Sequence, residues 1–258
     1  MEWTNQPFKG KKALIFGVAN ERSLAWSITK HLHQGGAEIG LNFLGEALER
    51  RVRPLAEQVN ASIIAPCNVT DENEIKALFT EVQEKWGTLD YLIHSLAFAQ
   101  KEELEGRFID TTKQGFLSSL EISAYSLVNL ARNAEPLMQN GGSIVTLSYY
   151  GAEKVIQNYN VMGVSKAALE ASVRYLANDL GKQKIRVNAI SAGPVKTLAA
   201  AGIRDFRTKL KDAEEKTPLK ENIHADDVGS LASFLCSDGA KHITGSTLYV
   251  DSGAHIMG

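Results

Sequence analysis

Two tyrosines and a lysine stand close together in the stretch YYGAEKVIQNYNVMGVSK, residues 149–166. Tyr159 and Lys166 are seven residues apart, nearly two helical turns, so in a helix both side chains leave from one face. A phenol beside an ammonium is a proton donor whose ionised form the cation stabilises. Tyr149 precedes the pair at the end of an apolar run. Taken alone, the stretch favours two packed tyrosines and a surface lysine, so its surroundings must decide.

The bulk composition is ordinary for a soluble globular protein, with 44% hydrophobic and 22% charged residues and a net charge of −2 among 258 residues. This balance argues against nucleic acid or an anionic membrane as the main partner. No apolar run approaches the roughly 20 residues that span a bilayer, and the N-terminal residues lack the apolar core of a signal peptide. Cys67 and Cys236 are far apart without metal-ligand spacing, which argues against a disulfide framework and a metal site and fits a reducing cytoplasm.

Apolar runs alternate with helical patterns along the whole chain. The runs are too apolar for a sheet with one solvent-exposed face. They therefore predict a Rossmann-like, doubly wound α/β fold, with a parallel sheet of about seven strands flanked by helices. No linker, repeat or low-complexity tract interrupts the pattern, so we expect residues 1–258 to form a single domain. The expected strands are 12–16, 38–43, 62–66, 89–95, 143–147, 186–191 and 246–250, and the expected helices are 23–34, 46–58, 72–85, 114–138, 160–180 and 226–236, with a loop over 97–112.

Ligands of such sheets bind beyond the carboxyl ends of the strands. Gly17 follows the first strand, where a dinucleotide pyrophosphate would lie against backbone N–H groups, although the pattern G-x-G-x-x-G is absent. Ala19 and Ser23 are small, and Ser23 can cap the next helix and donate to a phosphate. A plain strand–helix turn explains this motif about as well.

Leu44 follows the second strand, where many NAD-binding proteins carry an acid and NADP-binding ones a basic residue. The nearest charges are acidic, Glu46 and Glu49, which disfavours a 2′-phosphate and predicts NADH rather than NADPH. Arg50 and Arg51 lie further along the helix.

Small or polar residues follow the remaining strands. Asn68 is either an adenine contact or an ordinary turn residue. Ser95 and Ala97 would let a cofactor lie close to the backbone. We expect one common edge to carry Gly17, Asn68, Ser95, Tyr149 and Gly193, the last within the strand-breaking Ala192, Gly193 and Pro194.

With these motifs the chain resembles a short-chain dehydrogenase/reductase. Within that group it resembles the NADH-dependent enoyl-acyl-carrier-protein reductases of bacterial and plastid fatty-acid synthesis. The resemblance covers nearly the whole chain and is carried by the Gly17-x5-Ser23 turn, SLAFA at 95–99, residues 147–177 and the ending YVDSGAHIMG. Ordinary members of the wider group have Tyr-x3-Lys, but that position here is Gly163. Tyr-x6-Lys is the divergent spacing that marks the enoyl reductases.

The resemblance implies a role for each matching residue. Tyr159 would be the catalytic tyrosine and Lys166 would hold the nicotinamide ribose. Tyr149 would line the substrate pocket, either as a second donor or as a wall. Taken together, the expected cofactor contacts are Gly17, Ala19, Ser23, Leu24, Leu44, Asn68, Val69, Ser95, Leu96, Ala97, Lys166, Ala192, Gly193, Pro194, Val195, Thr197, Leu198 and Ala199, and the expected substrate contacts are Ala99, Tyr149, Tyr159, Met162, Ala199, Ile203 and Phe206.

Three positions depart from the family pattern. Asn68 stands where Asp is frequent, but its amide oxygen can still accept from the adenine amino group. Leu44 stands where Gln is common, so a ribose contact there would use the backbone. Gln157 replaces a common Pro, which predicts a looser approach to Tyr159.

A substrate-binding lid is predicted at about 195–220. The segment 198–218 within it starts with LAAAGI, which is small and apolar and suits an acyl chain. Ile203 and Phe206 would face that chain. Arg204 and Arg207 are either a solvated helix face or a docking patch for acidic acyl carrier protein.

The expected activity is NADH-dependent reduction of the trans-2 double bond of enoyl-acyl carrier protein. The alternatives are a reductase of 3-oxoacyl thioesters or ketones and a non-catalytic NAD-binding regulator. The resemblance also implies a homotetramer, in the cytoplasm of a bacterium or in a plastid stroma. His94 is expected to be a satisfied core residue rather than a catalyst.

Overall fold

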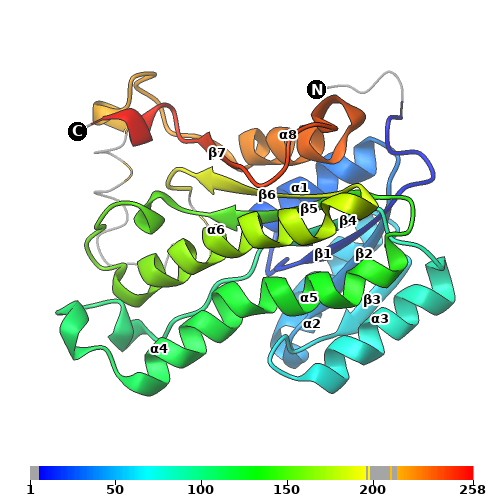
Figure 1. The fold of residues 1–258 in the computed structure, drawn as a ribbon, viewed down its shortest axis with the longest axis horizontal. Helices are drawn as coiled ribbons and strands as arrows, with labels where there is room; N and C mark the ends of the chain where they lie inside the picture. Colours follow the sequence, from blue (N-terminus) through cyan, green and yellow to red (C-terminus); the bar gives the residue numbers. More distant parts are fainter. Residues whose placement is uncertain (1–5, 196, 198–209, 211–213, 258) are drawn as a thin grey trace.

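The computed structural model describes residues 6–195, 197, 210 and 214–257. Seven parallel strands form one sheet in the order β3-β2-β1-β4-β5-β6-β7 (Figure 1). This order confirms the predicted doubly wound parallel sheet. The strands are β1 (Lys12–Phe16), β2 (Glu38–Phe43), β3 (Ile63–Pro66), β4 (Tyr91–His94), β5 (Gly142–Ser148), β6 (Ile185–Ala192) and β7 (Thr247–Val250).

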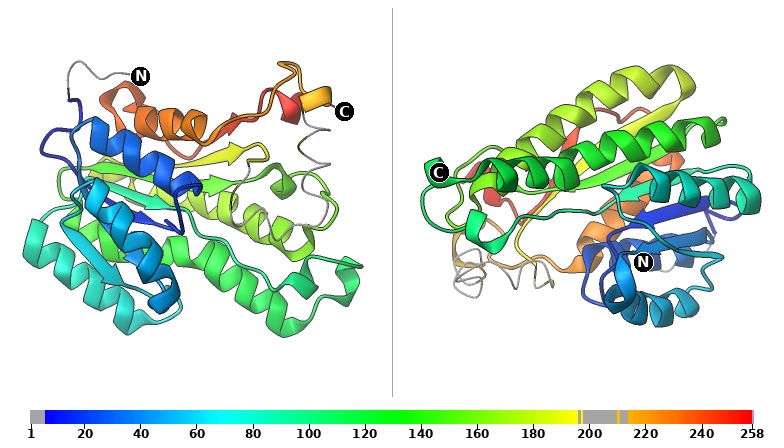
Figure 2. Two further views of the ribbon diagram at one scale, coloured as in Figure 1. Left: turned by 180° about the vertical axis from the view of Figure 1, so that it is seen from behind. Right: turned by 90° about the horizontal axis from the view of Figure 1, so that it is seen from below.

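Helices cover both faces of the sheet, as the right-hand view of Figure 2 shows. One layer holds α1 (Leu24–Gln34), α2 (Gly45–Gln58) and α8 (Ala225–Cys236), and the other holds α3 (Glu72–Trp86), α5 (Ser126–Ala134) and α6 (Asn160–Leu180). None of the helices in the described ranges is long and apolar enough to cross a membrane.

The two helix layers pack on opposite faces of the sheet and form two separate hydrophobic cores. Strand β1 contributes residues to both cores, which explains why its sequence is apolar throughout. Ala13 and Ile15 belong to the core under α1, α2 and α8, whereas Leu14 and Phe16 belong to the core under α3, α5 and α6. Successive strand residues point to opposite faces, so a strand buried on both sides must be continuously apolar.

The helical stretch predicted over 114–138 is confirmed, but it is not α-helical throughout. The structure has α4 (Lys113–Leu120), a π-helical turn at Glu121–Tyr125, then α5 and a 3-10 turn at Glu135–Leu137. The hydroxyl of Ser126 donates to the carbonyl oxygen of Ile122 at 2.6 Å. Such a side-chain bond competes for the backbone acceptor within a helix, and apolar periodicity does not register the extra residue of a π turn.

The predicted loop over 97–112 also differs, because it contains 3-10 turns at Lys101–Glu103 and Phe108–Asp110. It begins directly after β4 and leads into α4.

The order in which successive strands are added across the sheet changes direction between β1 and β4. These neighbouring strands pair from Ala13 and Tyr91 to Phe16 and His94. After β1 the chain builds outward to β2 and β3, and after β4 it builds the other way. The carboxyl ends at this reversal open a crevice, which is where open α/β sheets bind ligands.

Candidate active site

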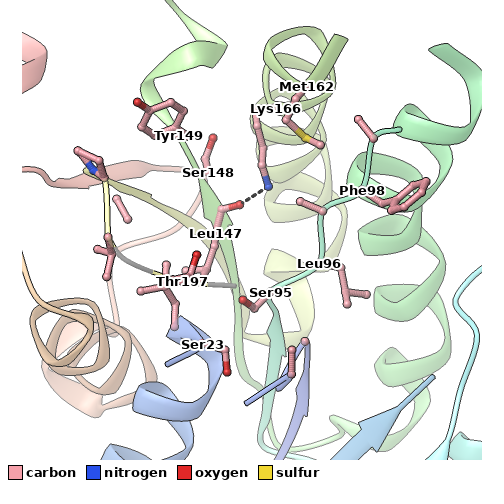
Figure 3. Close-up of a pocket in the computed structure, with 18 of the residues that line it drawn as sticks. Ser23, Ser95, Leu96, Phe98, Leu147, Ser148, Tyr149, Met162, Lys166 and Thr197 are labelled. Atoms are coloured by element: carbon pink, nitrogen blue, oxygen red, sulfur yellow. Dashed lines mark hydrogen bonds between the residues drawn. The ribbon is translucent and has the colours of Figure 1, made fainter. Parts of the chain in front are cut away.

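A cavity of about 580 Å³ lies at the carboxyl ends of the central strands (Figure 3). Most of the predicted site residues that the structure describes line it. They are Gly17, Ala19, Ser23, Leu24, Ser95, Leu96, Ala97, Ala99, Tyr149, Tyr159, Met162, Lys166, Ala192, Gly193, Pro194, Val195 and Thr197. Residues remote in the sequence therefore meet in one crevice, as the strand ends predicted.

Three predicted cofactor contacts do not line this cavity: Leu44, Asn68 and Val69. The side-chain oxygen of Asn68 accepts hydrogen bonds from the backbone N–H and the hydroxyl of Thr70, at 3.1 and 2.9 Å. This bonding is that of an ordinary turn asparagine, and contact of Asn68 with adenine stays a prediction. The predicted residues Leu198, Ala199, Ile203 and Phe206, with Arg204 and Arg207, lie outside the described residues.

Tyr159 precedes α6 rather than lying within it. It occupies the N-cap position, with φ −127° and ψ −24°, and the helix begins at Asn160. The Tyr159 ring is buried and packs edge-on against Tyr149, with ring centroids 5.0 Å apart and an interplanar angle of 69°. Burial raises the pKa of the Tyr159 phenol, and Tyr149 adds to the rise, so the hydroxyl keeps its proton and remains a donor.

Lys166 is buried in α6, so the interpretation as a surface lysine is wrong. Its Nζ donates a hydrogen bond to the carbonyl oxygen of Leu147 at 2.7 Å, which aims the amine into the crevice beside β5 (Figure 3). Burial lowers the pKa of Lys166 to about 8, while the Glu170 carboxylate acts in the opposite direction. An amine of this kind is mostly protonated at neutral pH.

Gly163 stands at the lysine position of the pattern Tyr-x3-Lys, and its surroundings leave no room for a side chain. A Cβ at Gly163 would lie 2.8 Å from the carbonyl oxygen of Gly151, in the 3-10 turn Tyr150–Ala152. A Cβ at Gly151 would in turn lie 2.6 Å from the Tyr159 ring. The turn after β5 thus packs where the earlier lysine would stand, and the amine enters the crevice from Lys166, one helical turn further on.

The pyrophosphate end of the crevice is built from the turn after β1. Gly17 has φ +99°, and a Cβ there would collide with the carbonyl oxygen of Ser95. Only glycine therefore allows β1 and β4 to end so close together.

Ser23 is the N-cap of α1, but its side chain does not cap the helix. Its hydroxyl donates to the carbonyl oxygen of Asn20 at 2.6 Å, and the first turn of α1 holds no acidic residue. The prediction that Ser23 caps the helix is therefore wrong. The side chain leaves the N-terminal N–H groups of α1 to other acceptors, which suits a phosphate.

The charge of the cavity is one-sided. Among the described lining residues, the charged side chains are Lys101 and Lys166, and none is a carboxylate. A positive and mostly apolar lining suits an anionic dinucleotide.

His94 stays in the core, as expected. Its Nε2 lies 2.7 Å from Ser126 Oγ and its Nδ1 lies 2.8 Å from Thr146 Oγ1. Each ring nitrogen therefore has a hydroxyl partner, and the tautomer of the ring sets which atom of each pair donates. Burial, and to a lesser extent the Lys166 charge, lowers the pKa of His94 to about 3, so the ring is neutral. His94 does not line the cavity.

Several lining residues escaped the sequence prediction. Phe98, Lys101 and Leu104 come from the loop after β4. The position of this loop at the carboxyl end of a strand could have predicted that it lines the cavity. Ser148 directly precedes Tyr149, and its hydroxyl donates to the Glu170 carboxylate. Leu48 and Leu147 also line the cavity, and no local pattern marks them.

The crevice between β1 and β4, with a buried phenol and amine beside it, places the chain in the class of nucleotide-dependent short-chain dehydrogenases and reductases. Within that class, the chain belongs to the enoyl-(acyl carrier protein) reductase family, whose sequence model matches residues 17–255.

Relatives with curated names agree over nearly the full length. The chain is 53% identical over 255 residues to the enoyl-acyl-carrier-protein reductase (NADH) FabI of Rickettsia typhi, covering 99% of this chain and 98% of the relative. It is 49% identical over 252 residues to the protein of the same name from Bacillus cereus, covering 97% of this chain and 98% of the relative.

Solved structures agree as well. The enoyl-acyl-carrier-protein reductase of Anaplasma phagocytophilum, in complex with NAD, has a TM-score of 0.95 and 52% identity, covering 100% of this chain and 98% of that one. The Bacillus cereus enzyme, with NADP+ and indole naphthyridinone, has a TM-score of 0.96 and 48% identity, covering 98% of this chain and 99% of that one.

Proposed function

We propose that this chain is an NADH-dependent enoyl-acyl-carrier-protein reductase of fatty-acid synthesis, which reduces the trans-2 double bond of the enoyl thioester to the saturated acyl thioester. The observation that carries the proposal is the buried pair Tyr159 and Lys166 in one crevice, at the spacing Tyr-x6-Lys. The similar proteins named above are NADH reductases of this kind.

The residues of the crevice fit the cofactor. Gly17 and the start of α1 would take the pyrophosphate, and Lys166 would take the nicotinamide ribose. Bound NADH supplies the hydride for the β-carbon of the enoyl thioester. The Gly193 backbone lies close to Asp251, where an added Cβ would come within 3.1 Å of the Asp251 Cα, so this side of the crevice is kept free of side-chain bulk. The other predicted contacts, including Leu44, Asn68, Val69, Leu198 and Ala199, are part of this proposal.

Tyr159 acts on the charge that develops during reduction. As the β-carbon is reduced, negative charge builds on the thioester oxygen, and the Tyr159 hydroxyl donates a hydrogen bond or its proton there. Losing one such donor typically costs about 10²- to 10³-fold in rate. The raised pKa of Tyr159 keeps the donor protonated until charge develops.

Lys166 and Tyr149 support that donor. The ammonium of Lys166 would bind ribose hydroxyls and bias the local field toward negative charge. The edge-on contact of Tyr149 with Tyr159 supports a role as the wall that fixes the catalytic ring.

The surroundings of Leu44 support NADH rather than NADPH. This residue is the N-cap of α2, and the first turn of that helix carries an acidic residue, Glu46. No basic residue stands at or directly beside Leu44 in the sequence to take a 2′-phosphate.

The wider arrangement is also part of the proposal. Residues 1–258 form one catalytic domain with a substrate lid over 195–220, and the enzyme works as a homotetramer that receives its substrate from acyl carrier protein. Its setting is the cytoplasm of a bacterium or a plastid stroma, which fits two cysteines, Cys67 and Cys236, that are both free and buried.

NADH oxidation tests the function directly. The purified protein is assayed with crotonyl-CoA and with acetoacetyl-CoA, each with NADH and with NADPH. We expect turnover with crotonyl-CoA and NADH. Turnover with acetoacetyl-CoA alone would make the chain a 3-oxoacyl reductase, and no turnover with either thioester would contradict a reductase of thioesters.

A further inference from the structure

One wall of the cavity is irregular backbone that depends on other elements for its position. This wall segment, residues 97–106, follows β4 and contributes Ala97, Phe98, Ala99, Lys101 and Leu104 to the cavity. Its regular structure is a single 3-10 turn of three residues, Lys101–Glu103. A loop of this kind holds its shape only where side chains or neighbouring elements fix it.

The first anchor of the wall segment is Ser123, in the π-helical turn Glu121–Tyr125. Its buried hydroxyl accepts a hydrogen bond from the backbone N–H of Phe98 at 3.0 Å and donates one to the carbonyl oxygen of Phe98 at 3.2 Å. One side chain thus satisfies both backbone groups of a residue that faces the cavity.

The second anchor is Glu103, whose buried carboxylate accepts from the backbone N–H of Thr112 at 3.1 Å and from the Thr112 hydroxyl. A Cβ at Gly115 would collide with this carboxylate, so glycine at the start of α4 makes room for it. This anchor closes the loop upon itself and does not tie it to Tyr159.

The third anchor is Asn160, the residue that follows Tyr159. Its Nδ2 donates to the carbonyl oxygens of Glu105 and Gly106, at 3.2 and 3.3 Å. In the described part of the chain, no other hydrogen bond joins residues 104–107 to a helix or strand outside the loop.

The backbone at Asn160 is held in an uncommon conformation. Asn158 and Asn160 have φ of +59° and +27°, so residues with positive φ flank Tyr159 on both sides. Asparagine tolerates this region better than most residues, but such conformations persist only where the surroundings hold them, and they cluster at functional sites. Asn158 forms no side-chain hydrogen bond among the described residues, so the contact that accompanies the strain belongs to Asn160.

We propose that Asn160 is a positioning residue, which clamps the wall segment against the start of α6 and so fixes the substrate-facing wall relative to the Tyr159 hydroxyl. The inference rests on the proposed function and deepens it. A bound acyl chain would contact the wall segment on one side and the Tyr159 hydroxyl on the other. The two hydrogen bonds from Asn160 join the wall segment to the residue next to Tyr159. The dinucleotide end of the crevice, at Gly17 and Ser23, does not touch the clamp.

Two variants of Asn160 separate the clamp from the backbone strain. Asn160→Gly removes both donors and relieves the positive φ. Asn160→Asp keeps the shape and turns a carboxylate toward two carbonyl oxygens. The matched control is Asn158→Gly, which relieves positive φ on the other side of Tyr159 without touching the wall segment. Ser123→Ala releases the opposite end of the wall and serves if the Asp variant does not fold.

We expect both Asn160 variants to raise KM for crotonyl-CoA by about 10-fold, because misplacement of substrate by a fraction of an ångström is costly. KM for NADH should stay within about two-fold of the wild-type value, and Asn158→Gly should leave both constants unchanged. An unchanged KM for crotonyl-CoA in Asn160→Gly would overturn the clamp. So would an equal rise in both constants, or an Asn158→Gly variant that matches Asn160→Gly.

Hydrogen exchange tests the clamp without turnover, so its failure is distinct from failure of the proposed function. In Asn160→Gly, amides of residues 97–110 should exchange at least about 10-fold faster while those of β5 and α6 stay protected. Unchanged exchange over residues 97–110 would refute the clamp even if the enzyme reduces crotonyl-CoA. Faster exchange with no thioester reduction by the wild-type protein would sink the proposed function and leave the clamp as a purely structural contact.

Discussion

At the residue scale, the chemistry depends on two buried groups whose burial shifts their pKa values in opposite directions. Burial raises the pKa of the Tyr159 phenol and lowers that of the Lys166 amine to about 8. Both shifts favour the uncharged form, yet at neutral pH the phenol is neutral and the amine is mostly charged. The pair therefore meets the substrate as a proton donor with a cation nearby.

The two roles predict different losses on mutation. Tyr159→Phe removes a donor that acts on developing charge, so kcat should fall by about 10²- to 10³-fold while the Kd for NADH changes little. Lys166→Ala removes the ribose contact, so the Kd for NADH itself should rise. Isothermal titration and steady-state kinetics measure both, and an equal loss of NADH affinity in the two variants would refute this division of roles.

The lowered pKa of Lys166 makes stability depend on pH. Below pH 8 the amine is charged in both the folded and the unfolded chain, and burial penalises the folded one. Between about pH 8 and the unfolded value near 10.5, the unfolded chain binds more protons, so wild-type stability rises with pH.

Lys166→Met lacks this dependence. Its free energy of unfolding should exceed that of wild type by roughly 1–3 kcal/mol at pH 7.5, and the difference should shrink at pH 10. Urea unfolding at the two pH values checks this, and a difference that does not change with pH would contradict a lowered pKa.

At the scale of elements, the join between β5 and α6 sets the catalytic spacing. The 3-10 turn Tyr150–Ala152 packs its Gly151 against both Gly163 and the Tyr159 ring. The sequence predicts both the spacing Tyr-x6-Lys and a helix that begins at residue 160, as observed. Only the structure shows that the backbone of Gly151 occupies the space beside Gly163. A contact of this kind between distant segments leaves no periodic pattern in the sequence.

Gly163→Ala tests that packing. Alanine would gain up to about 1 kcal/mol in helix propensity, but its Cβ meets a backbone oxygen at 2.8 Å, and overpacking typically costs about 1–3 kcal/mol. We therefore expect a lower Tm and a lower kcat, as α6 and Tyr159 are pushed apart from the turn. Gly181→Ala, at the end of α6 with open space around its Cβ position, is the control. A Tm that rises in Gly163→Ala would show that the contact imposes no constraint.

At the scale of the whole molecule, the covered parallel sheet and most of the crevice follow from the sequence. Runs apolar on both faces predict a covered parallel sheet, and residues directly after strands predict its active edge, which is why Gly17, Ser95, Tyr149 and Gly193 line one cavity. Asn68 also follows a strand but bonds within its own turn instead. Contacts made by the backbone, such as the hydrogen bond from Lys166 to the Leu147 carbonyl oxygen, cannot be predicted from the pattern of side chains.

The encounter with acyl carrier protein is a property of the outer surface. If Arg204 and Arg207 form the docking patch, Arg204→Glu with Arg207→Glu should raise KM for the carrier-linked substrate by about 10-fold or more, because charge pairs steer such encounters. KM for the CoA thioester should not change. An equal rise in KM for both substrates, or no change in either, would refute docking.

In the proposed reaction, this crevice directs hydride to the β-carbon of an enoyl thioester. The most direct measurement uses NADH labelled with deuterium at the transferred position of C4, with crotonyl-CoA as substrate, and locates the label in the product by NMR. We expect butyryl-CoA with deuterium at C3. Product without deuterium at C3, or label appearing only on the hydroxyl-bearing carbon of 3-hydroxybutyryl-CoA when acetoacetyl-CoA is supplied, would contradict it.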